Sequence, residues 1–181
     1  MATEILRPNG VGDQNPLTPV GAAANWDCCD EAGADDDTTY VYKTGSSFGN
    51  DYYALQDTAL TTETIDSIDA WDRSEASGGA GTGDDSRTGV RLSAVTTWGP
   101  ETQLTASYVD HEGAALARPG GGSWAVSDLN GLQVAASCRQ NGANSSRITQ
   151  VYVEVNNSAA VNAGRQAVGR GIGRGVARGA R

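Results

Sequence analysis

The strongest constraint on this chain is that apolar residues alternate with polar ones over short segments, while no segment shows the periodicity of a long helix. In residues 132–139 every second position, from Leu132 to Cys138, is apolar or small, and residues 147–155 repeat the pattern with three valines. An alternation with a period of two is typical of half-buried antiparallel strands. Both segments are therefore predicted to be strands with one face in a core.

Turn residues divide much of the remaining sequence into pieces of similar length. Further strands are predicted at residues 3–7, 22–29, 38–43, 51–56, 63–71, 89–97 and 103–109. A single helical turn is predicted at residues 123–130, and the glycine-rich residues 77–85 are predicted to be a hairpin tip. The lack of crossover helices excludes a parallel α/β fold. The predicted fold class is all-β: an antiparallel β-sandwich of the jelly-roll type.

The N-terminal residues 1–20 are predicted to be an extended arm that precedes a sandwich formed by residues 21–158. Pro8, Pro16 and Pro19 prevent a continuous strand there. Such an arm can add to the sheet edge of a neighbouring molecule, or it can form a strand of its own sheet. The sequence leaves both interpretations open.

Residues 159–181 form a basic, glycine-rich tail with five arginines and no acidic residue. The rest of the chain holds eight basic and all 22 acidic residues, so a body of net charge −14 carries a tail of +5. A flexible tail is the usual behaviour of such a composition. A four-residue repeat, however, needs a partner surface whether it is a strand or a helix, and we predict that it connects subunits. The residues of this repeat are Val168, Arg170, Ile172, Arg174, Val176 and Arg178.

Three cysteines are candidates for a disulfide. Neighbouring cysteines rarely bond to each other, so Cys29, or Cys28 in its place, would pair with Cys138 in an oxidising compartment. Reduced thiols are the alternative. Together with His111, the single histidine, the cysteines match no zinc-binding spacing.

The metal candidates are three consecutive carboxylates, Asp35, Asp36 and Asp37. Closely spaced carboxylates on a loop supply the oxygen ligands that calcium requires, although the spacing differs from that of an EF-hand. A solvated acidic turn, or a docking surface for arginines, is the alternative. No other cofactor is predicted.

No arrangement in the sequence predicts catalysis, and we expect that the protein is not an enzyme. A hydrolase needs paired carboxylates across a cleft, or a nucleophile with an oriented base. His111 lies in a predicted turn, and no Gly-x-Ser-x-Gly motif accompanies it. Carbohydrate binding is the stronger alternative, because jelly rolls bind sugars through exposed aromatic residues and the chain has four tryptophans and six tyrosines. Core packing is the competing role for each of them.

The acidic body argues against nucleic acid as its partner, and no apolar window is long enough to cross a membrane. The N-terminus lacks the basic region and apolar core of an ordinary secretory signal. An extracellular or virion setting is still expected, through another export route or through release of assembled particles. Asn144 and Asn156 begin Asn-x-Ser triplets and are the candidate glycosylation sites.

Five segments carry a family resemblance in their order along the chain: LRPNGVGD, DDDTTYVY, YYALQD, SWAVSDLNGLQVAAS and RITQVYVEV. They resemble uncharacterised jelly-roll domains from phage structural gene clusters and environmental samples, including subunits of extracellular helical fibrils. The resemblance covers residues 5–155, and residues 124–133 and 147–155 are its most specific parts. It implies a jelly roll without established catalytic residues. The cysteines and the tail are not part of it.

The leading hypothesis is a structural subunit that assembles with copies of itself into an extracellular or virion-associated helical fibre through its arm and tail. Head-to-tail contacts form filaments when their rotation does not close. The alternative is a monomeric carbohydrate-binding module or adhesin with a disordered basic tail. A third hypothesis is that the tail binds nucleic acid or another anionic polymer.

Overall fold

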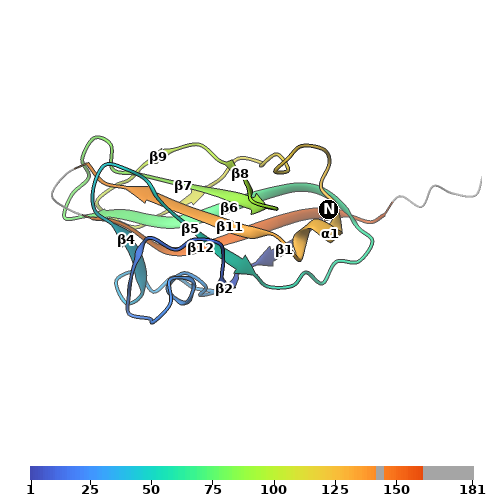
Figure 1. The fold of residues 1–181 in the computed structure, drawn as a ribbon, viewed down its shortest axis with the longest axis horizontal. Helices are drawn as coiled ribbons and strands as arrows, with labels where there is room; N and C mark the ends of the chain where they lie inside the picture. The colour runs from blue at the N-terminus through green and yellow to red at the C-terminus, as the bar shows by residue number, and fades with distance from the viewer. Residues whose placement is uncertain (142–144, 161–181) are drawn as a thin grey trace, which may run out of the picture.

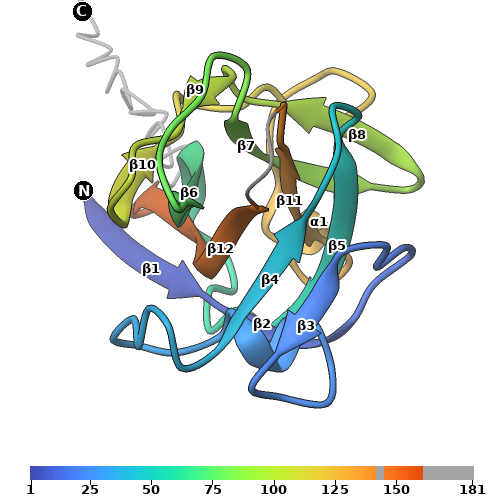
Figure 2. The ribbon, with the colours of Figure 1, turned by 90° about the vertical axis from the view of Figure 1, so that its left-hand side faces the viewer.

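The computed structural model describes residues 1–141 and 145–160. In these residues the chain forms twelve strands, a 3₁₀-helix at Trp26–Cys28 and a four-residue helix, α1, at Val126–Leu129. The strands make two six-stranded antiparallel sheets, which lie on opposite sides of the molecule in Figure 2. The predicted all-β sandwich is confirmed.

Sheet A contains the two longest strands, which lie side by side at its centre. Its order is β10-β6-β12-β4-β3, and β1 pairs with the part of β12 that β4 does not reach. Its strands are β1 (Ala2–Leu6), β3 (Thr18–Val20), β4 (Tyr40–Lys43), β6 (Thr64–Ser77), β10 (Val109–Glu112) and β12 (Ser145–Ser158).

Sheet B has the order β2-β5-β11-β7-β8, and β9 also pairs with β7. Its strands are β2 (Pro8–Val11), β5 (Gly49–Leu55), β7 (Asp85–Leu92), β8 (Val95–Trp98), β9 (Thr102–Gln103) and β11 (Gln133–Arg139). The chain passes repeatedly from one sheet to the other, for instance from β1 to β2 and from β6 to β7 (Figure 1). Such crossings are the jelly-roll feature of the fold.

The core lies between the sheets and is built by side-chain alternation. Val151, Val153 and Val155 on β12 and Val134 and Ala136 on β11 are all fully buried. Each buried valine stabilises the fold by roughly 1.5–3 kcal/mol relative to an exposed one. The inward faces predicted for residues 132–139 and 147–155 are therefore the ones that form the core.

The first twenty residues belong to the sandwich itself. β1 pairs with β12, β2 with β5 and β3 with β4. At the end of β2 the chain approaches β5 closely: the Gly12 N–H donates to the Tyr52 carbonyl oxygen at 2.9 Å, and a Cβ on Gly12 would lie 2.4 Å from that oxygen. In this structure the arm therefore forms strands of its own two sheets, which is the second of the two interpretations.

Three predicted strands are interrupted or absent. Residues 22–29 form bends and the 3₁₀-helix, and residues 103–109 are strand only at their ends. Residues 89–97 contain the hairpin turn Ser93–Ala94 between β7 and β8, with φ of +48° and +68°. Positive φ at both central positions is typical of a type I′ hairpin turn. Neither residue is glycine, asparagine or aspartate, so the sequence lacks the residues that favour positive φ in such a turn.

The helical turn predicted at residues 123–130 is confirmed as α1. Asp128 accepts two hydrogen bonds of 2.8 Å from the Arg118 guanidinium, and the Trp124 indole N–H donates to the Leu116 carbonyl oxygen at 3.0 Å. Trp124 also packs against the core, so its role here is structural. Neither helix of the described residues is long and apolar enough to cross a membrane.

Candidate functional site

The outer face of sheet A carries aromatic and charged side chains from its two central strands. On β6, Ala70 and Asp72 are buried in the interior, so Trp71 and Arg73 point outward. On β12 the buried valines flank Tyr152, which points outward as well. The alternation that builds the core therefore also places these three side chains on one surface.

Trp71 and Tyr152 lie directly opposite each other across β6 and β12. Their ring centroids are 5.8 Å apart and their planes differ by 10°, which is the geometry of an offset stack. Both residues are partly exposed. The guanidinium carbon of Arg7 lies 5.2 Å from the centroid of the Tyr152 ring. We call Trp71 and Tyr152 the aromatic pair.

Polar side chains border the aromatic pair on the neighbouring positions. Glu112 on β10 lies opposite Trp71, and Glu154 on β12 lies opposite Asp69 on β6. The Asn156 amide donates to an Asp69 carboxylate oxygen at 2.9 Å and so orients it. The aromatic pair is thus surrounded by groups that can exchange hydrogen bonds with hydroxyl or amino groups.

The charged groups around the aromatic pair affect the pKa of Tyr152. Burial raises the pKa of the Tyr152 phenol, and the negative charges of Glu154, Asp110 and Glu112 raise it further, whereas the charge of Arg7 opposes them. The phenol therefore stays protonated at neutral pH and can both donate and accept a hydrogen bond.

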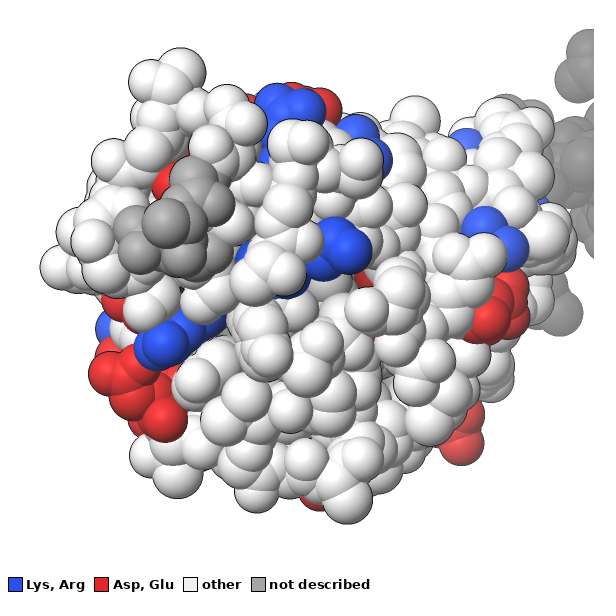
Figure 3. Space-filling view, turned by 60° about the vertical axis from the view of Figure 1, so that its left-hand side comes forward, with Lys and Arg blue, Asp and Glu red and all other residues white. Residues whose placement is uncertain are grey.

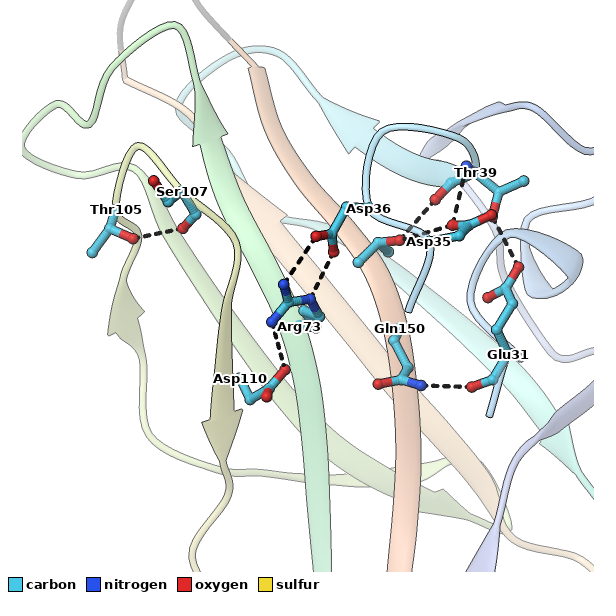
Figure 4. A network of polar contacts seen from close by, with 10 residues as sticks. Glu31, Asp35, Asp36, Thr39, Arg73, Thr105, Ser107, Asp110 and Gln150 are labelled. Atoms are coloured by element: carbon cyan, nitrogen blue, oxygen red, sulfur yellow. Dashed lines mark hydrogen bonds and ion pairs between the residues drawn. The ribbon is translucent and has the colours of Figure 1, made fainter. Parts of the chain in front are cut away.

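An acidic loop, residues 30–37, also contacts this face. It forms ion pairs with Arg73 on β6 (Figure 4) and with Arg147 on β12. Asp36 accepts hydrogen bonds from Nε and Nη2 of Arg73 at 2.6 and 2.9 Å, and Asp110 accepts a third from the same guanidinium at 3.1 Å. The hydrogen bonds from Arg73 hold the pKa of Asp36 below its usual range. This loop is thereby fastened to β6.

The three calcium candidates point to different partners. Asp35 accepts a hydrogen bond from the Thr39 hydroxyl at 2.9 Å, Asp36 binds Arg73, and Asp37 binds Arg147 at 2.7 Å. Within residues 1–141 and 145–160, no group of three or more His, Cys, Asp or Glu side chains is placed to hold a metal ion. Arginine docking, the alternative to calcium, is therefore present at Asp36 and Asp37, and the arginines belong to the same chain.

The outer face of sheet B also combines aromatic rings with arginines, but there the arginines cover the rings. The Arg87 guanidinium carbon lies 4.1 Å from the Phe48 centroid and 4.4 Å from the Trp98 centroid. Arg91 lies over Tyr52 at 4.6 Å. These distances are typical of cation–π contacts. Tyr53 belongs to the core, whereas its neighbour Tyr52 points to the outer face and is only 6 % exposed under this cover.

Carboxylates in turn neutralise the arginines of sheet B. Arg139 binds Asp85 at 2.7 Å and Glu101 at 3.1 Å, and Arg91 binds Asp13 at 2.7 Å. In the view of Figure 3, basic side chains lie in separate groups, several of them beside acidic ones, and most of the surface between them is uncharged. Because paired arginines cover Phe48, Trp98 and Tyr52, these aromatic residues have a structural role.

The three cysteines are free and fully buried. The Cys29 thiol is 3.7 Å from the Ile148 carbonyl oxygen, and the Cys138 thiol is 3.5 Å from the Ser146 carbonyl oxygen. Burial raises the pKa of both thiols. In this structure Cys29 and Cys138 are not bonded to each other, and each thiol donates to a carbonyl oxygen of β12.

The remaining predicted residues are divided between described and undescribed parts of the chain. At the candidate glycosylation site Asn156, the side-chain amide donates hydrogen bonds to Ser67 and Asp69 on the neighbouring strand β6. Asn144 lies outside the described residues. The same holds for the repeat of the tail, namely Val168, Arg170, Ile172, Arg174, Val176 and Arg178.

A buried aspartate that the sequence patterns did not indicate connects the N-terminal segment to sheet B. Asp51 is fully buried and accepts hydrogen bonds from the Leu17 N–H at 2.9 Å, the Asn25 amide at 2.6 Å and the Tyr53 hydroxyl at 2.8 Å. Burial raises the pKa of Asp51, and these donors act in the opposite direction. Three donors to one carboxylate satisfy its hydrogen-bonding needs in the interior.

His111 lies opposite a second buried aspartate, Asp72, which accepts a hydrogen bond from the Ser74 hydroxyl at 2.7 Å. The residue types are those of a nucleophile, a base and an acid. However, Ser74 is fully buried, so a substrate cannot reach it in this structure.

A separate small pocket of about 220 Å³ is lined by Ser46, Gly83, Arg139 and Asn141 at the loop end of the sandwich.

The sequence matches no family model and no curated protein. Among solved structures, the fold is similar to that of TmCBM61 in complex with beta-1,4-galactotriose. The two chains are 13 % identical, the match covers 82 % of this chain and 86 % of that one, and the TM-score is 0.40. Similarity at this level does not indicate a shared ligand or function.

Proposed function

We propose that the protein is a carbohydrate-binding module without catalytic activity, which binds a glycan on the outer face of sheet A. The observation that carries this proposal is the aromatic pair, two nearly parallel rings on adjacent strands, bordered by Glu112, Glu154 and Arg7.

The chemistry of sugars fits such a surface. A pyranose ring has a C–H face that packs against an aromatic ring, and hydroxyls that need hydrogen-bonding partners. Trp71 and Tyr152 supply large apolar rings, and the Tyr152 hydroxyl and a few charged side chains can then fix orientation. Because both rings stand on the longest paired strands of the sheet, their positions are set before a ligand arrives.

Isothermal titration calorimetry with a panel of hexasaccharides tests the proposal. We expect Trp71→Ala to weaken binding at least ~30-fold, because an aromatic residue at the centre of a binding surface contributes about 2 kcal/mol or more. Tyr42→Ala is the matched control, since Tyr42 is a partly exposed tyrosine on β4 of the same sheet, opposite Arg147 rather than Trp71. Equal losses in both variants, or no hexasaccharide bound by the unaltered protein, would contradict the proposal.

A fibre-forming subunit is the second candidate, and the charge distribution of the sequence favours it. The tail carries +5 and the body −14. Because β1, β2 and β3 pair within the sandwich, the tail alone would join the subunits, in an extracellular or virion setting. Negative-stain electron microscopy of the full chain and of residues 1–158 tests this candidate. Fibres are expected from the full chain alone; fibres from both chains, or from neither, would exclude it.

A further inference from the structure

We infer that the glycan bound by the aromatic pair carries amino groups, as a polymer of glucosamine does; this inference rests on the proposed function. It follows from the charges around the aromatic pair, and in particular from which of these charges are already neutralised within the chain.

Three carboxylates at the border of the aromatic pair have no cationic partner among the described residues. They are Glu112, Glu154 and Asp69, and none of them forms an ion pair there. Asp69 accepts hydrogen bonds from neutral groups, Ser67 at 3.0 Å and Asn156 at 2.9 Å. No cation of the described residues therefore neutralises these three carboxylates.

The arginines of this face do not balance that charge. The Arg73 guanidinium is held between Asp36 and Asp110. Arg7 is the cation next to Tyr152, and its Nη1 donates to the Glu31 carbonyl oxygen at 2.9 Å. One guanidinium beside three unpaired carboxylates leaves the border of the aromatic pair negative.

A negative border around aromatic rings selects among glycans by charge. An ammonium group gains charge-assisted hydrogen bonds from carboxylates and is also attracted to the faces of Trp and Tyr rings. Uronate or sulfate groups would be placed next to like charges, which suppresses their binding. Neutral sugars experience neither effect. The chemistry thus favours an amino sugar over an acetylated, neutral or acidic one.

Calorimetry with four hexasaccharides tests this inference, at a pH at which the free amine is protonated. The sugars are the hexamers of glucosamine, N-acetylglucosamine, glucose and galacturonic acid. We expect the glucosamine hexamer to bind at least ~10-fold more tightly than its acetylated form. The difference should shrink when ionic strength rises from about 0.01 to about 0.15 M, because the Debye length falls from about 30 to about 8 Å.

Isosteric variants assign the effect to the named carboxylates. Glu112→Gln and Glu154→Gln together should weaken binding of the glucosamine hexamer ~10-fold more than binding of the acetylated hexamer, which loses no charge-assisted contact. Asp57→Asn, at an exposed aspartate without an ion pair in the described chain, is the charge control and should bind like the unaltered protein. Thermal unfolding of each variant confirms that the fold is intact.

The outcomes separate this inference from the function on which it rests. Equal binding of the glucosamine and acetylated hexamers, preference for galacturonic acid, or no effect of the glutamine variants overturns the amino-sugar inference while the binding module stands. If none of the four hexasaccharides binds, the proposed function and the inference both fall.

Discussion

The outer faces of the two sheets use the same residue types for different purposes. On sheet B, Arg87 and Arg91 lie over the rings of Phe48, Trp98 and Tyr52 at 4.1–4.6 Å. At the centre of sheet A, Trp71 and Tyr152 stack on each other, and the Arg7 guanidinium carbon lies 5.2 Å from the Tyr152 centroid. Near β4 of the same sheet, Arg147 lies over Tyr40 at 4.5 Å, as the arginines of sheet B do over their rings. An aromatic residue at the surface of a sandwich is therefore not by itself a sign of a binding site. What matters is whether the chain itself already covers the ring.

The difference arises from where the acidic residues are placed. On sheet B they lie beside the arginines that cover the rings, as Asp13 does for Arg91. On sheet A, the acidic loop binds Arg73, so the charge of this cation is already paired within the chain. The acids nearest the pair remain unpaired among the described residues. The same stretch of aspartates that the sequence offers as a metal candidate thus neutralises two arginines of this sheet, Arg73 and Arg147.

The largest loss of stability is expected from a substitution that disturbs the backbone of sheet B beneath the covered rings. A Cβ at Gly89 would lie 2.4 Å from the Thr97 carbonyl oxygen and 3.0 Å from the Trp98 ring, so β8 would have to move. Gly89→Ala should lower the free energy of unfolding by about 3 kcal/mol, as measured by urea denaturation. Gly33→Ala, where nothing lies within 4 Å of the added Cβ, is the control and should change it little.

A smaller loss is expected when a covering contact is removed without altering the backbone. Trp98→Ala takes away one of the two rings that hold Arg87 and should destabilise the protein by about 2 kcal/mol. Glycan affinity should not change, because Trp98 is on the opposite sheet from the aromatic pair. Denaturation and calorimetry on the same sample measure both quantities. A fall in affinity with unchanged stability would reverse the roles that we assign to the two faces.

The smallest effect concerns the acidic loop and depends on pH. Asp36→Asn removes the charge that binds Arg73 and should cost about 0.5 kcal/mol at neutral pH, since the pair is partly exposed and screened by solvent. Asparagine tolerates the φ of +51° at this position. The folded-state pKa of Asp36 is lowered, so its stabilisation is complete above the unfolded pKa of about 3.9 and is lost as pH falls through the folded pKa.

Unfolding curves of the unaltered protein and of Asp36→Asn, recorded at neutral and at strongly acidic pH, check this expectation. The difference in stability should be present at neutral pH and vanish in acid. A difference that grows as pH falls would contradict the sign.

Much of the fold could be predicted where alternation is local. Residues 132–139 and 147–155 form β11 and most of β12 with the expected inward faces. The prediction was wrong where a turn lacks turn residues, as at Ser93–Ala94. It also ended β6 too early, at residue 71. The strand continues to Ser77, and its alternation between Ala70 and Asp72 turns Trp71 outward.

The candidate site was less accessible to sequence reasoning than the fold. Four tryptophans and six tyrosines suggest sugar binding as a class, but no local pattern separates Trp71 from Trp98 or Trp124. Their difference depends on neighbours from distant segments: Tyr152 beside Trp71, Arg87 over Trp98, and the core around Trp124. A ring's availability is a property of its surroundings, which pairing between strands creates.

The sequence by itself determined the all-β class, the inward faces of the regular strands and the charge contrast between body and tail, because each depends on composition or on neighbouring residues. Only the tertiary structure decided that β6 and β12 pair in the register that sets Trp71 opposite Tyr152, and that the acidic loop takes up Arg73. Strand register and long-range ion pairs are set by the burial of the whole core. A shift of one residue would turn every outward side chain inward.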